Sequence, residues 1–222
     1  MKWNKKFNYT SLNRIPVNGS RHYAVGQQRL PSVSTILSKT KSAEDKAALA
    51  SWIARVGEKE SERIKNAASA NGTKMHSLIE RYLKNRENLD LLETEEETGL
   101  AKQMADKIIS EGIQGKVNEV HGVECPLYHD GPRGWAGTAD LVATYESQLS
   151  ICDFKQKNSI MKESYSSYHE YMTQISGYSL AHDKLFGSTI TQGVILLATT
   201  DLVFQIFRID HVKLKEYQQK FL

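Results

Sequence analysis

The chain has 222 residues, 40% of them hydrophobic, and its 29 lysines and arginines nearly balance its 26 aspartates and glutamates. This composition supports a packed interior and excludes a uniformly basic nucleic-acid coat, although it is compatible with a local basic groove. Two cysteines, Cys125 and Cys152, are too few for a disulfide framework, a four-cysteine zinc site or an iron–sulfur cluster.

The chain carries no membrane or export signal in the residues given. Its longest apolar runs fall short of the roughly 20 residues that a membrane helix needs, and the lysines near the start are not followed by an apolar segment. A soluble, cytoplasmic protein without a membrane partner is therefore expected, and a monomer is the simplest assembly.

Short alternating pieces separated by Asn, Gly and Pro fill residues 1–31, which predicts an irregular arm or a small hairpin. Pro31 then leads into a helix. The next helix is predicted over residues 42–57, with Ser42 as N-cap, Asp45 as its capping-box partner and Gly57 at its end.

The pattern stays helical up to about residue 115. Helices are predicted over residues 58–72, 73–85 and 100–112, with Asn71-Gly72 closing the first and an acidic stretch at residues 90–99 preceding the last.

From Lys116 the hydrophobic period changes to that of strands. Three consecutive strands are predicted, then a helix, two strands and a closing helix, at residues 116–128, 134–145, 149–156, 171–186, 191–200, 202–209 and 212–222. This order predicts an α/β fold, with a mixed sheet flanked by helices and a helical lobe at the N-terminal side. A single domain is expected, composed of the arm (1–31), the helical lobe (32–115) and the α/β core (116–222).

Charged residues stand on two of the predicted strands. Asp153 and Lys155 are two positions apart and share a face, while Asp140 on the preceding strand is near Asp153 in hairpin register. Two carboxylates suit magnesium or manganese, and a lysine beside the metal can hold or deprotonate an attacking water. The alternative is a weak ion pair on an exposed edge, with Asp140 as a turn former.

A set of motifs in fixed order resembles the RecB-like clade of the PD-(D/E)XK nuclease superfamily. "GTAD" and "ICDFK" are similar to its acid and acid-x-lysine strands, "NGTKMHSLIERYL" to its G-x-x-x-H helix, "VECPLY" to its acid-bearing first strand and "TQISGYSLA" to its Q-x-x-x-Y helix. The matching residues are His76, Glu124, Asp140, Asp153, Lys155, Gln174 and Tyr178. "LPSVSTIL" is most similar to the exonucleases of mitochondrial genome maintenance and their phage relatives, and the resemblance spans about residues 22–210.

The resemblance implies a restriction-endonuclease-like core and a site for Mg²⁺, for which Mn²⁺ would substitute. Asp140 and Asp153 would ligate the metal together with the backbone carbonyl of Phe154. His76 would ligate this metal or a second one. Glu124 would hold a metal-bound water.

The resemblance also implies the residues that act beside the metal. Lys155 would orient or activate the water, with Gln174 and Tyr178 beside this lysine and the DNA backbone. The chain departs from the family pattern at Ala139, where the family name has proline, and at Gln156, where serine or threonine is usual.

Each implied residue has an ordinary alternative. His76 could be a satisfied histidine on a half-buried helix face, and Gln174 and Tyr178 could be helix-packing residues. Glu119 competes with Glu124 for the acid of the first strand, with the opposite strand phase.

A DNA path is expected from residues near these motifs. Ser32 and Ser34, with the amides at the helix start, form a candidate phosphate seat, and Lys157 and Tyr178 would contact the strand. Further cations and aromatics could follow the backbone and stack on bases, namely Trp52, Arg55, Lys59, Arg63, Lys65, Lys162, Tyr165, Tyr168 and Tyr171. The alternative places Trp52 in the core and leaves the charged helix faces simply solvated.

The sequence thus predicts a metal-dependent deoxyribonuclease, an exonuclease acting on ends of single-stranded DNA. Two alternatives stay open. One is a structure-specific endonuclease on the same fold, and the other is a DNA-binding module without catalysis.

Overall fold

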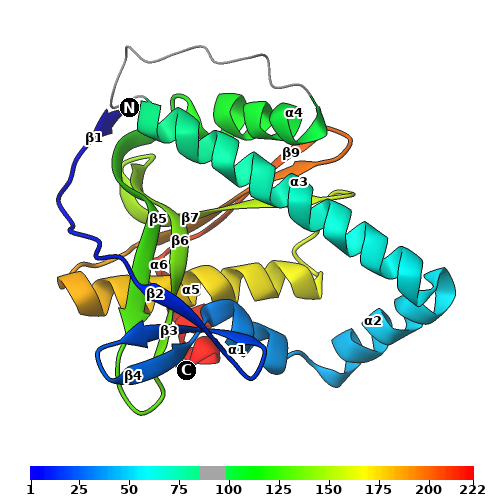
Figure 1. Ribbon diagram of the computed structural model, residues 1–222. Coiled ribbons are helices and arrows are strands. Elements are labelled where there is room, and N and C mark those ends of the chain that lie inside the picture. Colours follow the sequence, from blue (N-terminus) through cyan, green and yellow to red (C-terminus); the bar gives the residue numbers. More distant parts are fainter. Residues whose placement is uncertain (86–98) are drawn as a thin grey trace.

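A mixed six-stranded sheet forms the centre of the computed structural model, which describes residues 1–85 and 99–222 (Figure 1). The strand order is β1-β5-β6-β7-β8-β9. Strands β5 to β7 form an antiparallel meander, β8 runs parallel to β7, and β1 runs parallel to β5. The strands are β1 (Lys2–Trp3), β5 (Val117–His129), β6 (Trp135–Tyr145), β7 (Gln148–Lys157), β8 (Gln192–Thr199) and β9 (Phe204–Ile209).

The predicted strands and the mixed α/β fold are confirmed, including the short turn that leads from β6 to β7. Glu146 and Ser147 both have positive φ values, of 46° and 68°, and Tyr145 pairs with Gln148 across the turn. This is the two-residue turn whose twist matches that of a hairpin. The strands that carry Asp140 and Asp153 are therefore neighbours joined by a tight turn.

The first 31 residues contain more sheet than the sequence indicated. Strands β2 (Asn13–Val17), β3 (Ser20–Val25) and β4 (Gln28–Pro31) form a three-stranded antiparallel sheet, where an irregular arm or a small hairpin was predicted. The local signal was present: Asn18-Gly19, with φ values of 48° and 71°, is the favoured dipeptide of a hairpin turn.

The helices begin and end close to the predicted positions, apart from the helix predicted from residue 171, which begins five residues earlier, and a predicted break that is absent. They are α1 (Val33–Lys39), α2 (Ala43–Val56), α3 (Glu58–Asn85), α4 (Leu100–Lys107), the π-helical segment η1 (Ile108–Ile113), α5 (Ser166–Phe186) and α6 (His211–Phe221). Ser42 caps α2, since its Oγ accepts from the backbone N–H of Asp45 at 3.0 Å, as the capping-box pattern predicted. Of the predicted acidic stretch, residues 90–98 lie outside the described residues.

The absent break is the one predicted at Asn71-Gly72, because α3 runs through both residues without interruption. Gly72 lies where the helix passes close to β7. A Cβ atom at this position would be 3.3 Å from Nε2 of Gln156, and the same amide donates a hydrogen bond to the carbonyl of Ala68. The glycine therefore allows the helix to approach the sheet, and the sequence pattern of a helix end was misleading here.

Helices cover both faces of the central sheet (Figure 1). Helices α1, α5 and α6 pack on one face, over a core that includes Ile151 and Met172. Helices α3 and α4 pack on the other face, over a core that includes Phe154 and Leu141. Among the helices of the described residues, none combines the length and the apolar character needed to cross a membrane.

A buried histidine fastens the N-terminal segment to α5. His182 is fully buried, with Nε2 3.0 Å from the hydroxyl of Tyr9 and Nδ1 2.7 Å from Oγ of Ser188. The ring of Phe7 packs edge-on against it, with the ring centroids 4.6 Å apart. Burial lowers the pKa of His182 to about 4, since the charged imidazolium would lose its hydration there.

This histidine should make the protein sensitive to mild acid. Between pH 6.5 and pH 4 the unfolded chain binds a proton at His182 that the folded chain does not, so the free energy of unfolding falls as the pH falls through this range. The expected loss between pH 7 and pH 4 is about 3 kcal/mol. Urea unfolding of the wild type and of His182→Gln at both pH values measures it, and equal losses in the two proteins would contradict the assignment.

Candidate active site

Strands β6 and β7 separate at the point where the predicted acids stand. Their backbone pairing ends at Leu141 and Cys152, and beyond this pair the side chain of Asp140 replaces the backbone as hydrogen-bond partner of β7. Its Oδ2 accepts a hydrogen bond from the backbone N–H of Phe154 at 2.8 Å. A side chain thus satisfies a buried amide that a neighbouring strand would otherwise pair, and the fork between the two strands opens a cleft.

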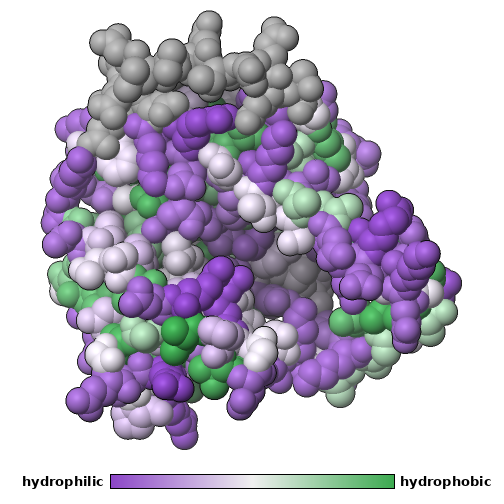
Figure 2. All heavy atoms as spheres, viewed as in Figure 1, coloured by the Kyte–Doolittle hydropathy of each residue, from purple (hydrophilic) through white to green (hydrophobic). Residues whose placement is uncertain are grey.

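The cleft has a volume of about 550 Å³, within the range of sites that bind small molecules. The surface is hollowed here, between α3 and the β2-β3-β4 sheet (Figure 2). It is lined by Arg14, Arg21, Tyr23, Ser34, Gly72, Thr73, His76, Ser77, Glu80, Glu124, Thr138, Asp140, Asp153, Lys155, Gln174 and Tyr178. The seven residues of the predicted motif order therefore meet in one place.

Lys155 connects the acids to α5. Its Nζ lies 2.5 Å from Oδ2 of Asp153 and donates to Oε1 of Gln174 at 3.1 Å. The amide nitrogen of Gln174 in turn lies 3.3 Å from the hydroxyl of Tyr178, so the i, i+4 pair on α5 faces the lysine as its spacing predicted. The ring of Tyr171 is 4.9 Å from the same Nζ.

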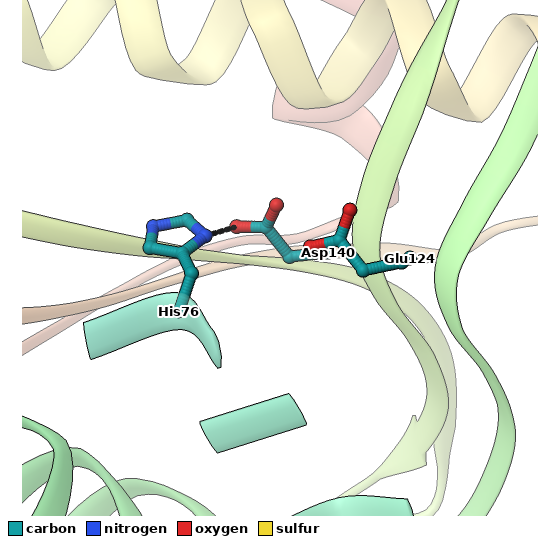
Figure 3. A group of neighbouring side chains, drawn as sticks. All are labelled: His76, Glu124 and Asp140. Atoms are coloured by element: carbon teal, nitrogen blue, oxygen red, sulfur yellow. Dashed lines mark ion pairs between the residues drawn. The ribbon is translucent and has the colours of Figure 1, made fainter. Parts of the chain in front are cut away.

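His76, Glu124 and Asp140 bring possible ligand atoms within 4.8 Å of one another, from α3, β5 and β6 (Figure 3). Nδ1 of His76 faces Oδ2 of Asp140 at 3.5 Å. These side chains belong to segments far apart in the sequence, and the α3 face carrying His76 is held against β7 by Gln156. The grouping is therefore a property of the fold and not of one local motif.

Glu124 has an unusual backbone conformation. Its φ is 51°, in the left-handed region that a residue with a Cβ rarely adopts, and it stands between the pairs Val123–Leu141 and Cys125–Ala139 of the β5–β6 ladder. Such a conformation costs on the order of 1–3 kcal/mol and is typical of functional sites.

The competing acid of the same strand lies elsewhere. Glu119 forms an ion pair with Lys2 at 3.0 Å and accepts a hydrogen bond from Asn4 at 2.8 Å, away from the cleft. Of the two alternatives that the sequence left open, Glu124 is the one at the cleft.

The carboxyl groups differ in acidity because their surroundings differ. Burial raises the pKa of Glu124 to about 7, and the charges of Asp140 and Glu80 act in the same direction. Burial also raises the pKa of Asp153 to about 6, against the opposing effect of Lys155. For Asp140, burial is outweighed by His76 and Lys155 and by the amide of Phe154, so its pKa is lowered.

The two basic groups retain their protons. Burial alone would lower the pKa of His76, but the charge and hydrogen bond of Asp140 outweigh burial and raise it to about 8. Burial likewise opposes the charge on Lys155, whereas Asp153 and Asp140 favour it and raise its pKa. Around Asp140 the cleft therefore combines two acids of raised pKa, Glu124 and Asp153, with two charged basic groups, His76 and Lys155.

This donor set fits a hard divalent cation. Asp153 is only 2% exposed, and among the described residues its Oδ2 has the ion pair with Lys155 but no hydrogen bond. Buried carboxylates next to an imidazole are ligands that Mg²⁺ or Mn²⁺ accepts. A bound cation would remove the cost of holding these charges close together.

Of the four residues predicted to contact the DNA strand, Ser32 and Lys157 lie outside the cleft, as do the nine further cations and aromatics of the predicted path. Ser32 is 1% exposed and acts as the N-cap of α1, with its Oγ accepting from the backbone N–H of Thr35 at 3.0 Å. Lys157 donates to Oγ of Ser167 at 3.0 Å. Ser34 and Tyr178 do line the cleft, so the proposed phosphate seat is reduced to Ser34.

The predicted stacking residues are divided between core and surface. Tyr168 is buried and belongs to the α5 face of the core, which removes it from the path. Trp52, for which the core was the alternative, is only half-buried on α2, a helix whose residues are all exposed or half-buried, and Nζ of Lys65 lies 5.9 Å from its ring. Tyr165 is exposed.

Sequence reasoning missed the contribution of the first strands. Arg14, Arg21 and Tyr23 line the cleft from β2 and β3, and Glu80 lines it from α3, one turn beyond His76. The alternation in "RHYAV" placed Arg21 and Tyr23 on one face, but nothing local indicated that this face would turn toward the acids.

The solved structures compared with this chain below are weak likenesses. No protein-family model and no curated protein sequence matches the chain. A solved structure from Eubacterium rectale, provisionally described as an exonuclease, superposes with a TM-score of 0.45 at 15% identity, over 69% of this chain and 63% of that one. The protein SSO0001 superposes with a TM-score of 0.33 at 9% identity, over 70% and 86%. The match spans less than two thirds of the first protein, and neither likeness carries an argument about function.

Proposed function

We propose that this chain is a metal-dependent nuclease of the RecB-like PD-(D/E)XK type, which hydrolyses phosphodiester bonds of DNA and acts from the ends of single strands. One observation supports the proposal above all: Asp140, Asp153 and Lys155 converge at the fork of a sheet inside a cleft. A protein without catalysis has no structural need for this buried group, because burying charge is costly.

The metal would be held around Asp140. His76 and Glu124 are the neighbouring donors, and Asp153, whose Oδ2 is paired with Lys155, lines the same cleft. When bound, Mg²⁺ supplies positive charge to the scissile phosphate and lowers the pKa of a water molecule. The rigid sheet and α3 keep the donors in place, so little reorganisation is required when substrate arrives.

Lys155 would act as a proton donor toward the reacting groups. Its raised pKa keeps Nζ charged, and Asp153 and Gln174 fix its direction through contacts of 2.5 Å and 3.1 Å. A charged ammonium so placed can orient the attacking water and stabilise negative charge that develops on the phosphate. The hydroxyl of Tyr178 accepts a hydrogen bond from Gln174 and so helps to keep the amide that contacts Lys155 in position.

The experiment is degradation of a linear single-stranded oligonucleotide labelled at one end. We expect hydrolysis in Mg²⁺ or Mn²⁺ and none after addition of EDTA or with the variant Asp153→Asn. Equal degradation by the variant would show that the activity belongs to a contaminant and would overturn the proposal.

A covalently closed circular strand separates the two enzymatic alternatives. Resistance of the circle supports an exonuclease, whereas its cleavage would identify an endonuclease. Binding of the strand without cleavage in every divalent metal would instead support the non-catalytic module.

A further inference from the structure

Two arginines of the small N-terminal sheet face the cleft from the side opposite to α3. In the β2–β3 ladder Arg14 pairs with Tyr23 and Pro16 pairs with Arg21, so the two arginines share a face as diagonal neighbours. The backbone positions of such neighbours are about 7–8 Å apart. Both side chains are exposed and line the cleft. Hydrophilic side chains border the hollow over these strands (Figure 2).

Neither guanidinium has a carboxylate partner among the residues that the structure describes. Within residues 1–85 and 99–222, no ion pair joins Arg14 or Arg21 to a carboxylate, although the same cleft contains four acidic side chains. The acids of the cleft stand on α3 and the large sheet, and the arginines stand on the small sheet. An anionic ligand that enters the cleft thus finds two arginines on the small sheet that are not paired with an acid, whereas Lys155 and His76 on the opposite side are paired with Asp153 and Asp140.

The small sheet that carries Arg14 and Arg21, called the cationic wall below, is held in a fixed position relative to the carboxylates of the cleft. The carbonyl of Arg21 accepts two hydrogen bonds, from the backbone N–H of Ser32 at 3.0 Å and from Oγ1 of Thr35 at 2.9 Å. Ser32 in turn forms a bridge with Ala136 of β6, four residues before Asp140 on the same strand. The buried serine therefore positions Arg21, and the distance between the arginine and the carboxylate cluster is set by hydrogen-bonded backbone.

The cationic wall continues beyond the cleft. A second hollow, of about 270 Å³, shares Arg21 and Ser34 with the cleft and ends at Lys39 of α1. Ser34 and Lys39 are both exposed. A path of hydroxyl and cationic groups therefore leads from the acids along α1 to its last residue, Lys39.

We propose that this surface, formed by Arg14, Arg21, Ser34 and Lys39, binds the backbone of the single-stranded substrate. Arg14 and Arg21 each hold one phosphate next to the scissile bond, and the strand leaves along Ser34 toward Lys39. Guanidinium groups suit this task because their fork of donors matches phosphate oxygens. The inference rests on the proposed function for its ligand, but its binding contacts can be measured without hydrolysis.

The test measures binding of a fluorescent 12-nucleotide single strand by fluorescence anisotropy at several salt concentrations, in the inactive Asp153→Asn background. Each lost phosphate contact lowers the slope of log affinity against log salt by about 0.7 for a single strand. Arg14→Gln with Arg21→Gln should therefore lower the slope by about 1.4 and weaken binding at low salt at least about tenfold. The double change to lysine should restore the slope, since it restores the charges.

Arg29→Gln is the matched control. Arg29 is an exposed arginine of β4 in the same sheet, outside the residues that line the two hollows. It should leave the slope unchanged. Circular dichroism verifies that the variants remain folded. In the active background, the double substitution Arg14→Gln with Arg21→Gln should raise KM more than it lowers kcat.

The outcomes separate this inference from the proposed function. An unchanged slope in the double glutamine variant, or an equal loss with Arg29→Gln, overturns the arginine wall, while hydrolysis by the wild type would leave the nuclease intact. Loss of binding in the double variant, together with a wild type that never cleaves, would confirm the wall and refute the nuclease.

Discussion

Asp140→Asn is expected to reduce the rate of DNA hydrolysis by at least about 1,000-fold and to leave the fold intact. The amide oxygen can still accept from the N–H of Phe154, so the fork between β6 and β7 is retained. What is lost is the negative charge of Asp140, which pairs with His76 and would bind the proposed metal. Loss of a metal ligand removes several kcal/mol of transition-state stabilisation, and about 4 kcal/mol corresponds to this factor.

Single-turnover hydrolysis of the labelled strand in Mg²⁺ measures the effect, with urea unfolding as the test of folding. Glu119→Gln is the matched control, because it changes an acid of the same sheet that pairs with Lys2 outside the cleft. The control should keep full activity. Retention of activity by Asp140→Asn would place the metal elsewhere and contradict the proposed site.

Trp135→Ala should produce the largest loss of stability, about 3–5 kcal/mol in the free energy of unfolding. The indole is buried, with its ring stacked on His129 at 4.2 Å between centroids and packed edge-on against Phe221 at 4.9 Å. Its Nε1–H also donates to the carbonyl of Gly177 at 3.1 Å. The substitution leaves a cavity between β6, α5 and α6 and removes the hydrogen bond to the carbonyl of Gly177.

Trp52→Ala provides the comparison. This tryptophan is half-buried on α2 and should cost only about 1 kcal/mol, since most surface substitutions have small effects. Urea unfolding monitored by circular dichroism compares the two variants. A loss at Trp52 as large as that at Trp135 would mean that α2 is more firmly packed than its exposure indicates.

Much of the site was predictable because its chemistry lies on strands with a period of two. Asp153 and Lys155 had to share a face, and the short turn at Glu146 brought Asp140 into register with them. His76 and Glu124, which the motif order selected, line the same cleft.

Other features depend on contacts between distant segments and left no local signal. Gly72 looks like a helix end and instead allows a close approach to Gln156. Ser32 looks like a phosphate ligand and instead caps α1. The arginines at positions 14 and 21 belong to a sheet whose orientation is decided only when Ser32 docks on β6.

The amide at position 156 has a consequence for how this cleft could vary among related chains. Ala68, Gly72 and His76 follow one another at intervals of four residues, so they form one edge of α3, and Gln156 contacts the first two. Its side chain works as a spacer whose length sets how far the imidazole stands from the sheet. A serine or threonine at 156 is too short to reach the carbonyl of Ala68 from the same backbone position, so α3 would then have to be held against β7 by other contacts.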